Sequence, residues 1–78
     1  MYVGVKAVRA LKDYKLQLTF KNDEIKIFDV SPYLNKGVFK SLQDVDIFNS
    51  VRVAFDSIEW DNGIDIDPET LYEDSTLE

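Results

Sequence analysis

Apolar and polar residues alternate with a period of two along much of this chain, and that period constrains the fold more than any other feature. Leu16, Leu18 and Phe20 alternate with polar neighbours, and Ile25 and Ile27 resume the alternation after a polar stretch. Successive side chains of a strand point to opposite faces, so this pattern is typical of strands with one buried face. The sequence therefore predicts mostly sheet, with helices in a minor role.

The polar stretch between these two runs predicts a hairpin. A two-residue turn at Asn22-Asp23 places Phe20 opposite Ile25, and the other apolar side chains then share the same face. Lys21 and Glu24 become a charge pair at the tip of the hairpin. Hydrophobic pattern and turn chemistry agree on this register.

A strand is also expected ahead of this hairpin, over Val3–Ala10. Its apolar residues change parity between Ala7 and Val8, and an extra residue in one strand of a pair produces such a change. We therefore predict a β-bulge at that point, in a strand of the same sheet.

Three short alternating runs in the second half of the chain surround Asp61-Asn62-Gly63. They comprise Val51, Val53 and Phe55, then Ile58 and Trp60, then Ile64 and Ile66. A two-residue Asn-Gly turn would pair Trp60 with Asp65 and mix charged and apolar side chains on both faces. A three-residue loop with Gly63 in the left-handed conformation pairs Trp60 with Ile64 instead. We predict this loop, with Trp60 in the core and not at a partner surface.

Helix signals are few and short. Ser31-Pro32 predicts a single turn that ends near Gly37, and Ser41 predicts the start of a short helix that carries Val45, Ile47 and Phe48. Asp67-Pro68 repeats the start signal, with Asp67 as the N-cap residue. The chain is predicted to form one domain over residues 1–78, with residues 73–78 as a frayed tail.

Charge is distributed very unevenly along the chain. Residues 1–52 hold nine Lys and Arg against six Asp and Glu, a formal charge of +3, whereas residues 53–78 hold nine carboxylates and no cation, a charge of −9. Such an asymmetry indicates a partner surface and not a reaction. Because 45% of the residues are hydrophobic, we expect these charges to lie on a folded body.

Composition argues against several classes of function. The chain has no His and no Cys, the residues most used for general-base catalysis, thiol chemistry and transition-metal binding. Its three glycines match neither a dinucleotide-binding motif nor a P-loop, and no apolar run reaches the length of a membrane span. We expect no enzyme, no cofactor and no membrane segment. The early charge at Lys6 argues against a signal peptide and favours a cytoplasmic protein.

One acidic cluster has the composition of a cation site. Glu59, Asp61, Asp65, Asp67 and Glu69 place five carboxylates within eleven residues, and oxygen ligands suit a hard cation such as calcium. Their spacing does not fit an EF-hand loop. A turn at Asp61, the solvent face of a strand at Asp65 and helix capping at Asp67 account for them, so we predict no metal site here.

Four cations recur early in the chain, at Lys6, Arg9, Lys12 and Lys15. A solvated edge that discourages strand-to-strand aggregation explains them more simply than a nucleic-acid surface. The overall net charge of −6 also opposes phosphate binding. Direct binding of DNA or RNA is therefore not expected.

Several segments together resemble a known family. Trp60–Tyr72 carries the pattern W-x-N-G-x-D-x-x-P-E-x-L-Y, and Asp13–Phe20, Asn22–Glu24, Phe28–Val30 and Gly37–Phe39 match as well. Over almost its whole length the chain resembles the prokaryotic domain-of-unknown-function family DUF2442. It departs from that family at Asp23, where Gly is common.

The resemblance implies an α+β fold, a small single domain with a curved antiparallel sheet of about five or six short strands and one or two short helices. It implies no activity and no catalytic residue. Members look like small bacterial proteins encoded beside another small protein, in an arrangement similar to a toxin and antitoxin pair.

Two functions follow from these observations. The first is a non-catalytic interaction or regulatory module, an antitoxin-like partner of a small basic protein, which it binds through Asp65, Glu69, Glu73 and Asp74. The second is a small-molecule or metal-binding protein that uses the acidic segment 59–69. Sheet edges would also allow a homodimer.

Overall fold

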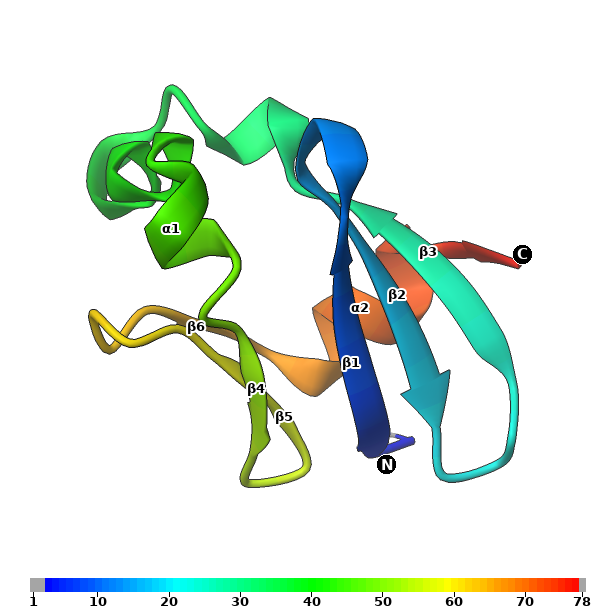
Figure 1. Ribbon diagram of the computed structural model, residues 1–78. Coiled ribbons are helices and arrows are strands. Elements are labelled where there is room, and N and C mark those ends of the chain that lie inside the picture. Colours follow the sequence, from blue (N-terminus) through cyan, green and yellow to red (C-terminus); the bar gives the residue numbers. More distant parts are fainter. Residues whose placement is uncertain (1–2, 78) are drawn as a thin grey trace.

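Two antiparallel sheets that meet at one corner form the framework of the α+β fold (Figure 1). The computed structural model describes residues 3–77. Sheet A has the order β1-β2-β3-β7, with β1 at Val5–Leu11, β2 at Lys15–Phe20, β3 at Ile25–Asp29 and β7 at Thr76–Leu77. Sheet B has the order β4-β5-β6, with β4 at Arg52–Ala54, β5 at Ser57–Glu59 and β6 at Asp65–Ile66. The predicted α+β class is confirmed, whereas the strands divide between two sheets and do not form one.

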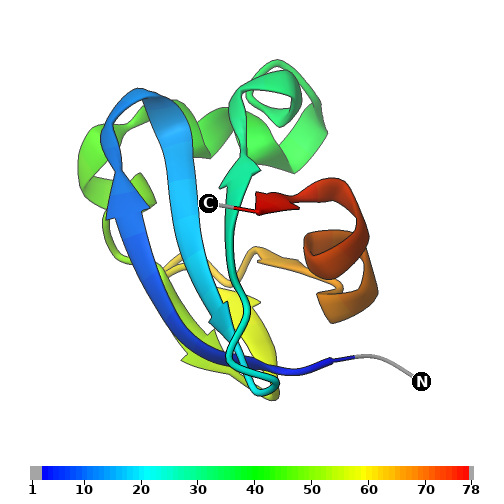
Figure 2. The same cartoon turned by 90° about the vertical axis from the view of Figure 1, so that its right-hand side faces the viewer.

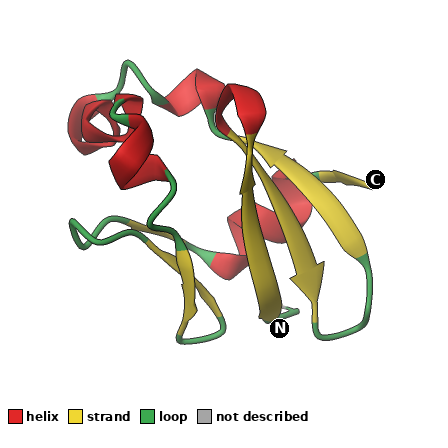
Figure 3. Ribbon diagram, in the orientation of Figure 1, coloured by secondary structure: helices red, strands yellow, loops and turns green. Residues whose placement is uncertain are grey.

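Short helices connect the two sheets and close the fold (Figure 3). Among residues 3–77, three are 3-10 turns, η1 at Lys12–Tyr14, η2 at Ser31–Tyr33 and η3 at Gly37–Gln43, and two are α-helices, α1 at Val45–Phe48 and α2 at Pro68–Asp74. The segment from η2 to α1 lies between β3 and β4 in the sequence and connects sheet A to sheet B. Within residues 3–77, no helix is long and apolar enough to span a membrane.

The helix starts predicted from the sequence are only partly confirmed by the structure. The turn at Ser31-Pro32 is present as η2, although Val30 is its N-cap residue. The helix expected to open at Ser41 begins at Val45, because the Asp44 carboxylate accepts a hydrogen bond from the backbone N of Asp46 and caps it. Helix α2 begins at Pro68 as predicted, yet the side chain of its N-cap residue Asp67 makes no capping hydrogen bond.

The register of the first hairpin differs from the prediction by one residue. Phe20 N donates to the carbonyl of Glu24 at 2.9 Å, so the loop has three residues, and Asp23 takes the left-handed conformation with φ 69°. Phe28 thereby lies opposite Leu16 on the buried face, while Ile25 turns to the outer face and is 40% exposed. Burial of the larger Phe28 ring outweighs exposure of the isoleucine.

The other strand predictions hold better. Ile58 lies opposite Ile66, Gly63 has φ 85°, and Trp60 is fully buried, as the three-residue loop requires. The first strand does contain an irregularity, but its register shift lies between Val5 and Ala7 and not at the predicted position between Ala7 and Val8.

Residues 73–77 do not fray. Glu73 and Asp74 end α2, Ser75 is buried, and Thr76–Leu77 forms β7 on the free edge of β3. Glu78 lies outside the described residues. The unpaired edge of β3 favours pairing with another strand. A strand of only two residues is too short to show an alternating pattern, so the sequence did not predict β7.

The core lies between sheet A, sheet B and α2, as Figure 2 shows with α2 on one side of sheet A. Its largest side chains come from β2, β3, β5, the loop after β5 and α2: Leu16, Leu18, Phe20, Phe28, Ile58, Trp60 and Leu71. Edge-to-face contact of Phe20 with Tyr72, at 4.9 Å between ring centroids, packs α2 on sheet A. The opposite face of sheet A, which carries Arg9 and Lys15, is left to solvent.

Candidate functional site

The acidic residues divide into those that pair within the protein and those that do not. Asp23 pairs with Lys6, Asp56 with Lys21, and Glu59 and Asp61 both with Arg52. A second set pairs with no cation of residues 3–77 at N···O distances up to 4.0 Å. Five members of this set lie within residues 65–74, and we call these five the acidic segment: Asp65, Asp67, Glu69, Glu73 and Asp74, all exposed.

Sheet B places the first of these residues against a like charge. Arg52 lies opposite Glu59, and Glu59 lies opposite Asp65, so the three side chains form one row across the sheet. Arg52 pairs with Glu59 at 3.6 Å and with Asp61 at 2.6 Å, on the far side of the row from Asp65. Like charges directly opposite each other destabilise a sheet. Asp65 is therefore an uncompensated carboxylate at a position where a neutral residue would be more stable.

Helix α2 also places like charges close together. Glu69 and Glu73 are four residues apart and share one face of the helix, an unfavourable spacing for like charges. Glu73 and Asp74 occupy the last turn, where the helix dipole favours cations, and the turn contains no basic residue. The buried side chain of Leu71 fixes the opposite face of the helix on the core. The charges of α2 accordingly face away from the core.

A groove of about 390 Å³ lies where sheet B meets the start of α2. We call it the sheet-B groove. Its lining includes Ala54, Phe55, Ser57, Glu59, Asp65, Asp67 and Pro68. The structure thus brings the predicted Asp65 together with Asp67, whereas Glu69, Glu73 and Asp74 follow along α2 outside the groove.

Phe55 is the residue of this region that the sequence reasoning missed. The alternation of Val51, Val53 and Phe55 predicted an apolar strand position, but β4 ends at Ala54, and Phe55 and Asp56 form the turn to β5. The Phe55 side chain is 95% exposed. Asp56 and Ser57 are common turn residues, but no Gly or Asn accompanies them, so the signal for this turn was weak.

The acidic residues do not converge on a metal position. Among residues 3–77 no group of three or more Asp and Glu side chains has the arrangement of a metal site. Arg52 already pairs with Glu59 and Asp61, two of the five carboxylates considered for a cation. The metal-binding hypothesis therefore gains no geometric support.

Comparison with protein families gives one match. The model of the family described as Protein of unknown function (DUF2442) matches residues 5–76. This chain belongs to the DUF2442 family. The match spans both sheets and α2 of the fold. Searches of curated proteins and of solved structures returned no match.

The closing pattern of this DUF2442 chain has structural roles in most of its positions. Trp60 and Leu71 are core residues, Gly63 supplies the left-handed turn residue, and Pro68 starts α2. Tyr72 donates a hydrogen bond from its hydroxyl to Glu24 and accepts one from Lys26 at its backbone carbonyl, at 2.7 Å. The pattern thus closes the fold around α2.

Tyr72 and Glu24 of this DUF2442 protein form a hydrogen-bonded pair that shifts the pKa of both groups. The hydrogen bond from Tyr72, with a second from the Asn22 amide at 2.6 Å, lowers the pKa of Glu24. The same bond raises the pKa of Tyr72, because an ionised tyrosine can no longer donate. The Lys26 ammonium lies 3.8 Å from the centroid of the Tyr72 ring. These contacts join the β2–β3 hairpin to α2.

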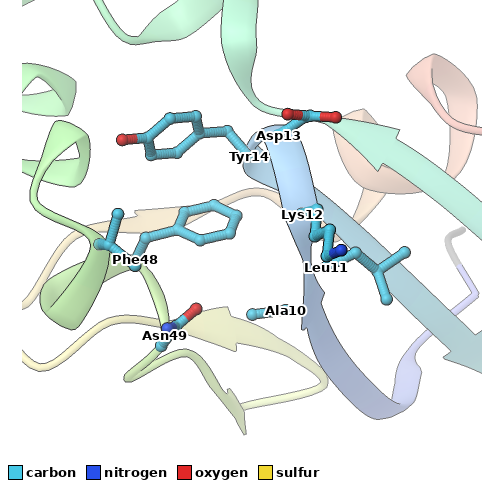
Figure 4. Close-up of a pocket in the computed structure, with 8 residues that line it drawn as sticks. Ala10, Leu11, Lys12, Asp13, Tyr14, Phe48 and Asn49 are labelled. Atoms are coloured by element: carbon cyan, nitrogen blue, oxygen red, sulfur yellow. The ribbon is translucent and has the colours of Figure 1, made fainter.

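A second hollow of this DUF2442 protein, the Tyr14 pocket, lies between the end of β1 and α1 (Figure 4). It measures about 500 Å³ and is lined by Ala10, Leu11, Lys12, Asp13, Tyr14, Val45, Phe48 and Asn49. Tyr14 donates from its hydroxyl to the carbonyl of Gln43 at 2.6 Å, and its ring centroid lies 5.2 Å from that of Phe48. The pocket shares no residue with residues 59–69, on which the small-molecule hypothesis rested.

Proposed function

We propose that this DUF2442 protein is a non-catalytic interaction module whose acidic segment binds a basic partner protein. One observation carries the proposal: five exposed carboxylates with no cation partner among residues 3–77 lie within ten residues, 65–74, whereas Asp23, Asp56, Glu59 and Asp61 pair with cations. Several of the five stand where their charge lowers stability, at Asp65 opposite Glu59 and in the last turn of α2. A surface kept at a cost in stability is a common feature of functional sites.

A basic partner would relieve both kinds of repulsion. Complementary charge raises the association rate and selects against acidic competitors, and its effect weakens as salt screens it. Arg9 and Lys15 of sheet A lie on the face opposite α2, and Lys26, which reaches α2, contacts the backbone carbonyl and the ring of Tyr72 and pairs with no carboxylate of the acidic segment. A regulatory, antitoxin-like subunit of a small basic protein in the cytoplasm fits this chemistry.

The test is affinity purification of the tagged protein from its host at low salt, with mass spectrometry of the proteins that elute as salt rises. The captured partner is then purified and titrated against a variant that neutralises Asp65, Glu69, Glu73 and Asp74 as Asn or Gln. We expect the dissociation constant to rise at least about tenfold, or ~1.4 kcal/mol, with a weaker salt dependence.

A matched control neutralises four other exposed acids, Asp13, Asp29, Asp44 and Asp46, as Asn. Asn keeps the acceptor oxygen that Asp44 and Asp29 use for backbone hydrogen bonds, so this variant changes the net charge equally without removing the caps. Equal loss of binding in both variants would show that only net charge matters. Unchanged binding in the first variant would refute the proposed surface.

A further inference from the structure

The turn between β4 and β5 presents an aromatic ring to solvent under two unfavourable conditions. Phe55 is 95% exposed, and its φ is 52°, in the left-handed region that disfavours side chains such as phenylalanine. Asp56 follows with φ 65°, so both turn residues have positive φ, as in the hairpin turns that favour Asn and Gly. Neither burial nor turn chemistry explains a phenylalanine here.

The turn is held rigidly on sheet A. Val5 N donates to the carbonyl of Asp56 at 2.8 Å, and the Asp56 carboxylate pairs with Lys21. Gly4, next to this junction, leaves so little room that an added Cβ would lie 3.1 Å from the Asp56 Cβ. A turn whose backbone is held in place before binding loses less conformational freedom when a partner covers it.

The neighbours of Phe55 indicate the chemistry of what would cover it. Phe55 lines the sheet-B groove together with Asp65 and Asp67, neither of which pairs with a cation of residues 3–77. Glu59, which pairs with Arg52, contributes a third carboxylate to the groove. Aromatic residues surrounded by polar ones are the usual centres of binding energy at interfaces. A second copy of the chain is a poor occupant, because each copy has a net charge of −6.

We propose that the sheet-B groove binds a basic segment of the partner protein in which Lys or Arg flanks an apolar residue. The apolar residue packs on the Phe55 ring, and the cations lie on Asp65 and Asp67. This inference rests on the proposed function and assigns its centre to the tip of the β4–β5 hairpin. Glu69, Glu73 and Asp74 then contribute at longer range along α2.

The test uses a phage-displayed library of random peptides selected on the whole protein. The most enriched peptide is synthesised, and its dissociation constant is measured for the wild type and for Phe55→Asn. Because Asn is favoured at positive φ, this variant should melt no lower than the wild type while binding the peptide at least about tenfold more weakly. Val38→Asn, a change of another exposed apolar side chain (69% exposed), should leave binding unchanged.

The possible outcomes test this inference and the proposed function separately. Basic peptides with an apolar residue that lose affinity for Phe55→Asn support the inference. Basic peptides that bind Phe55→Asn like the wild type, yet lose affinity for Asp65→Asn with Asp67→Asn, overturn the role of Phe55 and leave the proposed function standing. Enrichment of peptides without Lys or Arg overturns both. A melting temperature that falls in Phe55→Asn, or a wild type that dimerises through this residue, also overturns the inference.

Discussion

Trp60 donates a hydrogen bond from Nε1 to the backbone carbonyl of Phe48 at 3.0 Å, and both side chains are buried. This contact joins the end of α1 to the loop that follows β5. Among residues 3–77 no buried side-chain nitrogen or oxygen lacks a hydrogen-bond partner, so the indole has both its apolar and its polar requirements met. The partner role considered for Trp60 is therefore not available to it, and the predicted core role is confirmed.

Replacement of Trp60 by Phe should lower the free energy of unfolding by about 2–4 kcal/mol, because it leaves a cavity and removes the hydrogen bond to Phe48. Urea denaturation followed by circular dichroism measures this change. Val38→Ala, at an exposed site, should shift stability by less than about 0.5 kcal/mol. Similar effects of the two variants would contradict the described packing.

The pair of Glu24 and Tyr72 predicts a stability optimum around neutral pH. The pKa of Glu24 is lowered from 4.5, so its stabilisation is present above that value and disappears as the pH falls through the lowered pKa. The pKa of Tyr72 is raised from 10.0, so its stabilisation is present below that value and disappears as the pH rises through the raised pKa.

The corresponding measurement compares melting temperatures of the wild type and of Glu24→Gln from acid to alkaline pH. The difference should be largest between pH 4.5 and 10.0 and should shrink in acid, where the wild-type carboxyl is itself neutral. The melting temperature of Tyr72→Phe should also differ most from the wild type between pH 4.5 and 10.0, with a smaller difference in acid. Tyr33→Phe is the control, since within residues 3–77 its hydroxyl makes no hydrogen bond. A difference independent of pH would contradict the assigned cause.

Gly4→Ala should destabilise the protein by about 1–2 kcal/mol, because an added methyl group forces backbone or side-chain shifts in a tightly packed junction. The new Cβ would lie 3.1 Å from the Asp56 Cβ and 3.3 Å from the Lys21 Cδ. Thermal denaturation of the single variant measures the cost. A neutral result would mean that the β4–β5 turn moves freely against β1, which would also weaken the case for a rigidly held Phe55.

Asp65→Asn should raise stability by roughly 0.2–1 kcal/mol, since it removes a carboxylate directly opposite Glu59. The gain should fade with added salt, which screens the repulsion between exposed charges. Denaturant titrations at low and high salt provide the measurement. If the variant were less stable than the wild type, the carboxylate would have an internal role and the acidic segment would not be kept at a cost.

Much of the fold could be predicted because local pattern and turn chemistry agreed. At Gly63 the glycine and the flanking apolar residues favoured a three-residue loop. The alternative two-residue turn would have mixed charged and apolar side chains on both faces, and the structure has the register of the three-residue loop. At Asp23 no glycine constrained the turn, and two isoleucines suggested a register that the packing of Phe28 overrides. The position opposite Leu18 is taken by Lys26, whose stem can lie on the buried face while its ammonium rests over Tyr72.

The candidate site was predictable only in its charge. The sequence located Asp65, Glu69, Glu73 and Asp74, and the structure exposes all four. Capping was the expected role of Asp67, which instead lines the sheet-B groove without a capping bond. Phe55 could not be found, because an exposed aromatic in a turn has the same local pattern as a buried strand residue, and only the position where β4 ends distinguishes them.

The left-handed residues in three of the turns give this domain unused capacity for stabilisation. Asp13, Tyr14 and Asp23 join Phe55 and Asp56 in holding positive φ without being glycine. Asn or Gly at Asp13 or Asp23 relieves strain without altering the core or the acidic segment, whereas Tyr14 packs on Phe48 and donates to the carbonyl of Gln43 and is not such a position. An engineered heat-resistant version could therefore be built from turn substitutions alone. In evolution, the same positions give the lineage a way to offset destabilising changes elsewhere in so small a chain.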